Sequence, residues 1–110
     1  MDQVLQAIVE PRRRDILSLV LTQELSAGTI AANFPNVTRP AISQHLKVLT
    51  EAGLITMRRQ GTRRLNRARP EGLAEVRAYL EQFWDESLQL LKQAAEAEEQ
   101  SLARRKRVAH

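Results

Sequence analysis

Residues 37–54 read VTRPAISQHLKVLTEAGL, and this stretch predicts one helix with a marked beginning and a marked end. Pro40 suits the first turn of a helix, where a backbone N–H has no helical partner to lose. The expected capping residue is therefore Thr38 or Arg39, which directly precede it. Gly53 is placed to adopt the left-handed conformation that ends many helices. We expect a single helix between these two signals.

The expected helix, residues 39–52, has two unlike faces. Its large apolar residues recur at helical spacing and form one stripe: Ile42, Leu46 and Leu49. The opposite face carries Pro40, Ser43, Gln44, Lys47 and Glu51. Such a face suits the major groove of DNA, because Gln can pair with adenine while Ser and Lys can reach base edges or phosphates. On an isolated helix, a solvated face would be the simpler interpretation, so the neighbouring segments decide between the two.

The segment before this helix predicts a shorter helix and a turn. Ser26 can cap a helix over residues 27–33, in which Ile30 and Ala31 face inward. Residues 34–37, FPNV, break that helix and lead into the next one. This arrangement is typical of a helix-turn-helix, although a plain helical hairpin has the same elements.

Two further helices are expected at the start of the chain, over residues 2–9 and 11–22, with Pro11 at the break between them. Their inward-facing apolar residues are Val4, Leu5, Ile8 and Val9 in the first helix and Ile16, Leu17, Val20 and Leu21 in the second. Three arginines at residues 12–14 open the second helix, against the preference of its positive N-terminal end. We interpret this triplet as a solvated turn, with a flanking phosphate contact as the alternative.

After Gly53 the pattern changes from helix to strand. Residues 55–69 contain two segments rich in β-favouring residues around the turn at residues 60–62, which predicts a β-hairpin. The arginines of this hairpin are Arg58, Arg59, Arg63, Arg64, Arg67 and Arg69. A free hairpin of this kind could serve solubility alone. Directly after a recognition-type helix, it indicates a wing that contacts phosphate or the minor groove.

Pro70 begins a final helix that we expect to run to about residue 100. Its seam resembles that of a coiled coil: Leu73, Val76, Leu80, Phe83, Ser87, Leu90 and Ala94, widened by Trp84, Leu88 and Leu91. A helix of about 30 residues is about 45 Å long, more than so small a domain can cover, so dimerisation is expected. Residues 101–110, with the basic run at 104–107, are expected to form a flexible tail; an accessory DNA contact there stays open.

Charge is segregated along the chain, whose formal net charge is +4. Residues 39–69 hold eight cations and one acid, while residues 70–99 hold eight acids and two cations. A basic block confined to one third of a domain is typical of a surface that binds a polyanion. Fourteen of the seventeen cations are arginines, which favour phosphates and guanine edges.

Composition also excludes several classes of protein. The chain has no cysteine, which excludes disulfides and thiolate metal sites, and its only histidines are His45 and His110. No nucleophile–base pair or metal cluster is recognisable, so we expect neither an enzyme nor a cofactor. No apolar run approaches the ~20 residues that span a bilayer, and residues 1–4 lack the layout of a signal peptide. We expect a cytoplasmic protein with one domain over residues 1–100.

Four stretches carry a family resemblance: PRRRDIL at 11–17, TRPAISQHLKVL at 38–49, AGL at 52–54 and GTRR at 61–64. Together with the order of the expected elements, they resemble the ArsR/SmtB family of winged helix-turn-helix repressors. The resemblance implies a mainly α-helical fold with a β-hairpin wing. It also implies a homodimer, built from the first and last helices, that binds a palindromic operator and represses transcription until a signal releases it.

The chain departs from that family at two places. Metal-sensing members carry cysteines near the start of the third helix, whereas residues 24–28, ELSAG, have none. Relatives commonly have an aromatic residue in the second wing strand where Asn66 stands. The resemblance is therefore to the non-metal branch. Any inducer is expected to be a small organic molecule lodged near Phe83 and Trp84; the alternative is that there is no inducer and that protein concentration alone sets control.

The residues expected to contact double-stranded DNA are Thr38, Arg39, Pro40, Ser43, Gln44, His45, Lys47, Arg58, Arg59, Thr62, Arg63 and Arg64. The residues expected at the dimer interface are Val4, Leu5, Ile8, Leu73, Val76, Leu80, Phe83, Trp84 and Leu90. The alternative function is a protein-interaction or antirepressor module that uses the same fold without specific DNA binding.

Overall fold

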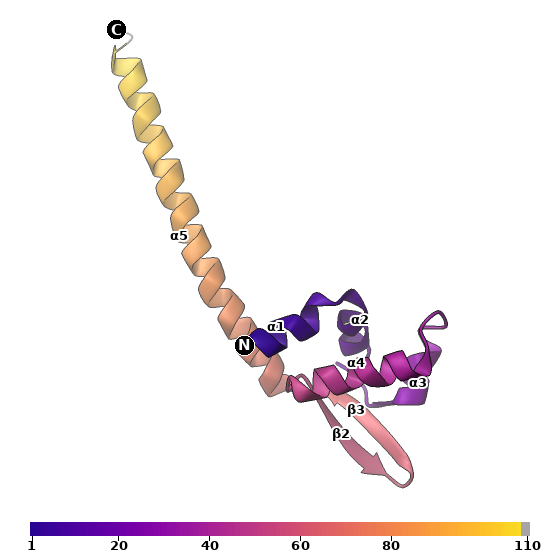
Figure 1. The fold of residues 1–110 in the computed structure, drawn as a ribbon. Helices are drawn as coiled ribbons and strands as arrows, with labels where there is room; N and C mark the ends of the chain where they lie inside the picture. The colour runs from indigo at the N-terminus through magenta and orange to yellow at the C-terminus, as the bar shows by residue number, and fades with distance from the viewer. Residues whose placement is uncertain (109–110) are drawn as a thin grey trace. The chain divides into compact units, whose positions relative to one another are not determined.

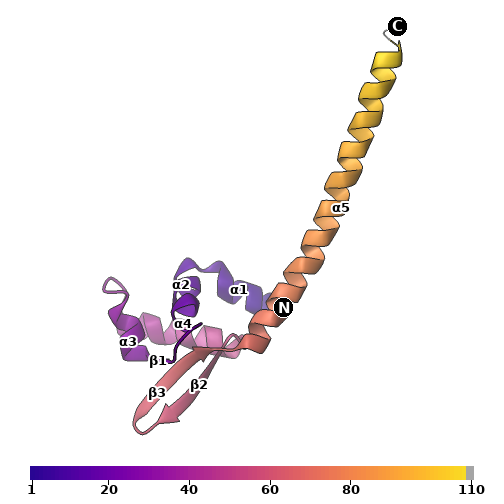
Figure 2. The same cartoon turned by 180° about the vertical axis from the view of Figure 1, so that it is seen from behind.

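The computed structural model describes residues 1–108, so His110 lies outside the described residues. The chain divides into two compact units, residues 1–76 and the residues from 77 onward, and each is described by itself. In chain order the elements are α1 (Asp2–Val9), α2 (Pro11–Leu19), β1 (Leu25–Ser26), α3 (Ala27–Ala32), α4 (Arg39–Glu51), β2 (Ile55–Gln60), β3 (Arg63–Ala68) and α5 (Pro70–Val108) (Figures 1 and 2).

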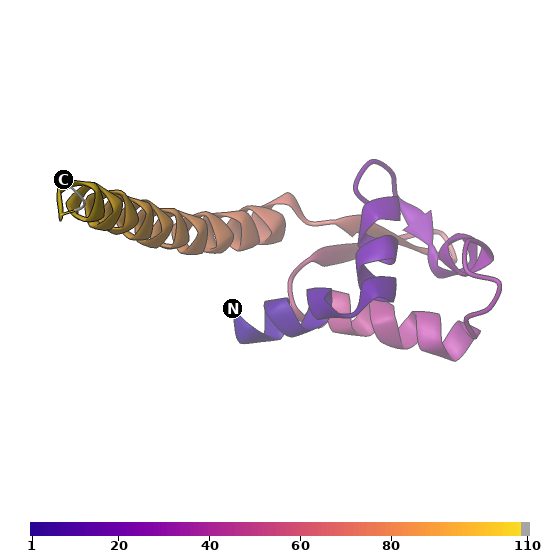
Figure 3. The same cartoon turned by 90° about the horizontal axis from the view of Figure 1, so that it is seen from above.

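The helices of the first unit pack around one apolar core, with α2 crossing α4 (Figure 3). The predicted stripe of α4 is confirmed, because Ile42, Leu46 and Leu49 are all buried in that core. The inward-facing residues predicted for the second helix are also buried, except Leu21, which is 48% exposed. The prediction for Leu21 was wrong because α2 ends at Leu19, so helical spacing no longer applies to it.

Side chains and one glycine set the ends of α4 and α3. Thr38 caps α4, since its hydroxyl oxygen accepts a hydrogen bond from the backbone N–H of Ala41 at 3.3 Å, and Arg39 is the first helical residue. Ser26 caps α3 in the same way. Gly53 has the predicted left-handed backbone just after α4, with φ of 77°. The helix-turn-helix therefore has the start and stop signals that the sequence predicts.

The predicted hairpin is confirmed, and it belongs to a three-stranded antiparallel sheet with the order β1-β3-β2. A tight turn joins β2 to β3, with Gly61 at φ of 62°. The sequence did not predict β1, which is two residues long and too short to show any periodicity. In this sheet Asn66 of β3 lies between Leu25 of β1 and Met57 of β2.

The final helix, α5, is longer than expected. It has 39 residues, which makes it about 58 Å long, and the expected domain boundary at residue 100 falls inside it. The arginines and lysine of the basic run lie in its last turns, where positive charge stabilises the negative end of the helix dipole. Among residues 1–108, no helix is both long enough and apolar enough to cross a membrane.

The end of α4 and the beginning of α5 approach each other closely. Gly72, in the first turn of α5, is buried, and a Cβ atom at this position would collide with the backbone carbonyl oxygen of Gly53. The same carbonyl oxygen accepts a hydrogen bond from Nη1 of Arg69 at 3.3 Å. Glycine at residue 72 therefore allows α5 to begin directly against the end of the recognition-type helix.

We predict that Gly72→Ala lowers the free energy of unfolding by about 1–3 kcal/mol, because the new methyl group must displace backbone rather than a flexible side chain. Gly28→Ala is the matched control. Its Cβ would lie 3.3 Å from Nη1 of Arg39, an atom at the end of a mobile side chain. Urea unfolding of both variants tests this, and equal stability of the two would contradict the close approach.

Candidate nucleic-acid interface

The outer face of α4 presents hydrogen-bonding side chains to solvent. Ser43, Gln44 and Lys47 are exposed, whereas the apolar stripe on the other side of the helix is buried. Lys47 pairs with Glu51 at 4.0 Å, and both side chains are more than half exposed. Exposed pairs of this kind contribute little to stability, so Lys47 remains available to another anion.

The arginines at residues 12–14 have defined partners within the chain. Arg13 donates hydrogen bonds to the carbonyl oxygens of Gln6 and Ala7, at 3.0 and 2.6 Å. Arg14 donates to the last two carbonyl oxygens of α1, at 2.8 and 2.9 Å. These oxygens have no partner inside the helix, and they lie at its negative end. The guanidinium groups of Arg13 and Arg14 therefore cap the C-terminus of α1.

Arg12 also has a partner, since its guanidinium carbon lies 5.1 Å from the centre of the Phe34 ring, a cation–π contact. The interpretation of residues 12–14 as a solvated turn was therefore wrong. The unfavourable position of three cations at the start of α2 is offset by their contacts with α1 and with the turn before α4. No spacing within the triplet indicates these contacts.

His45 does not lie on the exposed face of α4. Its ring is partly buried, and Nδ1 lies 3.5 Å from Nη1 of Arg13. Because Arg13 is itself bonded to α1, His45 connects the recognition-type helix with both α2 and α1. This geometry favours an anchoring role for His45 over a contact with DNA phosphate.

Glu10 caps α2, since its Oε2 accepts a hydrogen bond from the backbone N–H of Arg13 at 2.9 Å. Partial desolvation acts to raise the pKa of Glu10. The hydrogen bonds from the backbone N–H groups of Arg13 and Arg12, together with nearby positive charge, outweigh it. The pKa of Glu10 therefore lies below its ordinary value, and its ionised form stabilises the start of α2.

The arginines of the wing fall on two faces of the sheet, because side chains alternate along a strand. Arg59 and Arg64 lie directly opposite each other in neighbouring strands, on the face that also carries Met57 and Asn66. The other face carries Arg58, Arg63 and Arg67. Two like charges directly opposite each other are destabilising unless an anion lies between them.

Arg58 is already paired. Its Nε donates to Oε2 of Glu24 at 2.6 Å, and this hydrogen bond and the charge of Glu24 raise the pKa of Arg58 above its ordinary value. Its side chain still remains more than half exposed. Of the predicted DNA contacts in the wing, Arg58 is thus the one that must exchange an existing carboxylate for a phosphate.

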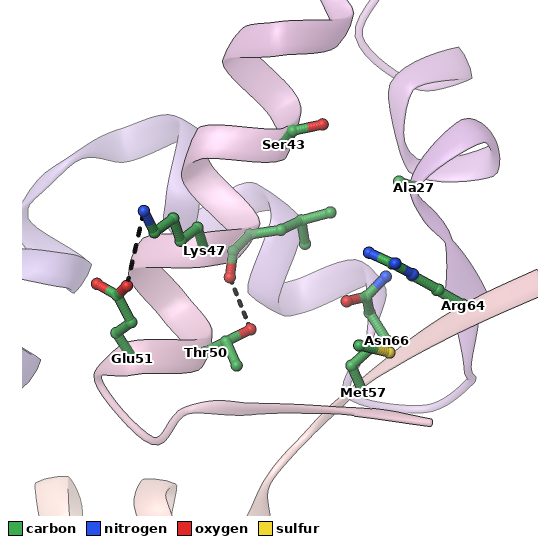
Figure 4. A pocket seen from close by; sticks show the side chains of 9 residues that line it. Ala27, Ser43, Lys47, Thr50, Glu51, Met57, Arg64 and Asn66 are labelled. Carbon is green, nitrogen blue, oxygen red and sulfur yellow. Dashed lines mark hydrogen bonds and ion pairs between the residues drawn. The ribbon is translucent and has the colours of Figure 1, made fainter. Parts of the chain in front are cut away.

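A groove of about 420 Å³, which we call the α4–wing groove, separates α4 from the hairpin (Figure 4). Its lining residues are Ala27, Ser43, Leu46, Lys47, Thr50, Glu51, Met57, Arg64 and Asn66. Asn66 is only 5% exposed, and its Nδ2 donates to the carbonyl oxygen of Leu25 at 3.2 Å. Asn66 is therefore a buried link between β3 and β1.

The residues predicted for the dimer interface divide between two environments. Val76 is buried in the core of the first unit. Three more of these residues pack against that core: Val4, Ile8 and Leu73. Leu5 is partly buried. The residues farther along α5 are exposed: Leu80, Phe83, Trp84 and Leu90, at 49%, 61%, 64% and 67%. The interface residues stay predictions; Val76 is the one among them that the core of the first unit buries, a difference that helical periodicity along α5 does not reveal.

A shallow hollow of about 430 Å³ beside Phe83 and Trp84 is lined by residues of α5 alone. A single helix cannot enclose a ligand, so this surface needs a second element to become a binding site. Within residues 1–108, no cluster of three or more His, Asp or Glu residues is arranged to hold a metal ion.

Comparison with known proteins shows which family the chain belongs to. Residues 10–57 match the family model described as "Bacterial regulatory protein, arsR family". The chain is 42% identical over 87 residues to the HTH-type transcriptional regulator Rv2034 of Mycobacterium tuberculosis, a match that covers 79% of this chain and 80% of that protein. The chain belongs to the ArsR family. Another relative is the transcriptional repressor SdpR of Bacillus subtilis, 43% identical over 61 residues, which cover 56% of this chain and 67% of that protein.

Solved structures agree with this family and with the fold. The crystal structure of a possible transcriptional regulator for arsenical resistance is 46% identical, with a TM-score of 0.68 over 76% of this chain and 85% of that one. The solution structure of a homodimeric winged helix-turn-helix domain from Mycobacterium bovis, from a possible ArsR-family regulator, is 30% identical. Its TM-score is 0.61, over 77% of this chain and 78% of that one.

This ArsR-family chain is therefore a transcriptional regulator with a DNA-binding winged helix-turn-helix fold, and its family is not enzymatic. The predicted fold class, family and function class are confirmed. The individual DNA contacts stay predictions, although every residue predicted for them is exposed except His45.

We predict that Glu10→Gln reduces stability at neutral pH and that this difference disappears in acid. Because the folded pKa of Glu10 is lowered, its contribution is complete above the ordinary value of 4.5 and is lost as the pH falls through the folded value. Urea unfolding midpoints at about pH 6 and about pH 3 measure the effect. Glu75→Gln, in an exposed part of α5, is the control; an equal pH dependence of both variants would contradict the capping role.

Proposed function

We propose that this ArsR-family chain is a homodimeric repressor that binds a palindromic operator through α4 and the wing. The observation that carries the proposal is the exposed face of α4, with Ser43, Gln44 and Lys47, beside the opposed Arg59 and Arg64 of the wing. A polar helix face held by a buried stripe can enter the major groove, and the adjoining guanidinium groups bind phosphates.

The proposed contacts have different roles along this surface. Gln44 and Ser43 read base edges, because they lie in the exposed middle of the helix face. Thr38, Arg39 and Pro40 lie at the N-terminus of α4, whose positive dipole end favours a phosphate. Wing contacts by Thr62 and the exposed arginines position the protein without reading sequence.

We propose that dimerisation uses the exposed apolar residues of α5. Phe83 and Trp84 are both more than half exposed, a large apolar surface that a second copy would cover. The related domain from Mycobacterium bovis is homodimeric, which supports the same assembly here. A two-fold dimer would bind half-sites about one DNA turn, ~10 base pairs, or a multiple apart.

The operator is released, in this proposal, by a small organic inducer rather than by a metal. The family model describes bacterial regulatory proteins, which supports a cytoplasmic location for a repressor that binds DNA. The second candidate function is a protein-interaction or antirepressor module with the same fold. It would show no salt-sensitive binding to duplex DNA, whereas a repressor that neutralises phosphates must show it.

We predict that Gln44→Ala relaxes specificity at one operator position by ~1–3 kcal/mol, because one base-edge contact is lost. Arg63→Ala should instead weaken binding to every duplex and lower the salt slope by about one unit. Gel shifts with the promoter region of the chain's own gene and with random DNA measure both effects. Equal weakening of the two DNAs by Gln44→Ala would show that Gln44 does not read a base.

We predict that Phe83→Glu gives monomers and abolishes operator binding, because it would bury an unpaired charge at the seam of α5. Sedimentation of the full chain and gel shifts are the measurements. Gln82→Glu adds the same carboxylate one residue away, on an exposed position off the seam, and should remain dimeric. A wild-type chain that is monomeric at micromolar concentration would refute the proposed assembly.

We predict that zinc, cadmium and arsenite do not release the operator. Thiophilic metals need thiolates, and the chain has no cysteine. Zinc accepts imidazole, but the chain has two histidines, and His45 is held against Arg13. Titration of the operator complex at near-stoichiometric metal tests this. Specific release by any of the three, with an intact circular dichroism spectrum, would falsify the prediction.

A further inference from the structure

We propose that the α4–wing groove binds a small organic acid that carries a carboxylate and a hydrogen-bond donor, and that this acid competes with DNA. The competition rests on the proposed function, whereas the binding itself does not. The groove, of about 420 Å³, has the size of an ordinary small-molecule site. Unlike the hollow on α5, it is lined by more than one element.

One positive charge is aimed into the groove. Figure 4 shows the Arg64 side chain extending from β3 toward α4, while Lys47 and Glu51, which also line the groove, turn toward each other. Among residues 1–108, Arg64 takes part in none of the ion pairs of the structure. Arg59 lies opposite Arg64 and adds a second positive charge on the same face. A guanidinium group in this setting favours a carboxylate, with two parallel N–H···O bonds.

A hydrogen-bond acceptor lies on the same face of the wing. Asn66 uses its Nδ2 to reach the carbonyl oxygen of Leu25, which leaves its amide oxygen to accept. No side-chain N or O atom within residues 1–108 is both buried and without a partner. The Asn66 oxygen accepts none of the side-chain hydrogen bonds of these residues, so it is not fully buried, and Figure 4 shows the amide pointing toward the groove. An occupant therefore needs an N–H or O–H group.

The other lining residues favour an organic molecule with an apolar part over a DNA phosphate. Leu46 and Met57 contribute apolar surface between the polar groups. A phosphodiester carries no hydrogen to donate to Asn66, and it would leave the apolar surface in contact with water. A compact ring or short chain between a carboxylate and a hydroxyl or N–H group satisfies all three requirements.

Binding at this site would act directly on DNA recognition. Arg64 belongs to the proposed phosphate-binding surface of the wing, and Ser43, which also lines the groove, belongs to the proposed base-reading face of α4. An acid bound to both Arg64 and Ser43 would prevent these residues from contacting DNA. Occupancy of the groove and occupancy of the operator would then exclude each other.

The test uses the full chain and 4-hydroxybenzoate as the probe, with binding measured by calorimetry and located by backbone amide NMR shifts. We expect shifts at Ser43, Arg64 and Asn66. Arg64→Gln should weaken binding about tenfold or more, since a charge-assisted hydrogen bond is lost. Arg67→Gln, on the opposite face of the same strand, should change it less than about twofold.

Two analogues test the chemistry of the ligand. Removal of the carboxylate in 4-hydroxybenzamide and of the donor in 4-methoxybenzoate should each weaken binding about tenfold. Shifts confined to α5, no shifts at millimolar probe, or equal losses in the Arg64 and Arg67 variants would overturn the site.

Competition is measured separately, as displacement of a labelled duplex from the chain's own promoter region. We expect displacement by 4-hydroxybenzoate from the wild-type chain at the concentrations that fill the groove. Groove binding without displacement overturns the competition. Absence of duplex binding before any acid is added counts against the proposed function instead, and leaves the groove to be judged by NMR and calorimetry alone.

Discussion

The burial of one side of α4 is the constraint on which the rest of the structure depends. Ile42 and Leu49 are fully buried, and together with Leu46 they fix the helix by one face only. Because that face is occupied by the core, the opposite face must remain at the surface whatever residues it carries. The short helices, the sheet and the first turns of α5 all contribute side chains to the core that holds this face. The packing of the core, rather than any contact made by the exposed side chains, therefore decides which residues of α4 lie at the surface.

Local signals in the sequence were sufficient for the helix-turn-helix and the wing. Thr38, Pro40 and Gly53 act within one turn of the chain, so the ends of α4 follow from residue type and position alone. The hairpin follows equally from its turn and its β-favouring residues. These elements carry most of the predicted DNA contacts, which is why the function class could be predicted from sequence.

What the sequence did not predict depends on contacts between segments that are distant in the chain. The partners of Arg13 are backbone carbonyl oxygens, which have no sequence signature. Asn66 is buried because β1 pairs with β3, and a strand of two residues shows no pattern. The burial of Val76 and the exposure of Phe83 on the same seam depend on where the core ends, not on periodicity.

Side chains alternate between the two faces of the wing strands, and this alternation restricts how the wing can change length. Arg64 and Asn66 face α4, while Leu65 between them faces the other way. Insertion or deletion of a single residue in β3 would exchange these faces, placing leucine in the groove and asparagine outside it. A matched change of two residues in each strand would lengthen the hairpin without this exchange. Length variation in the wing is thus restricted to even steps, unless a bulge absorbs the odd residue.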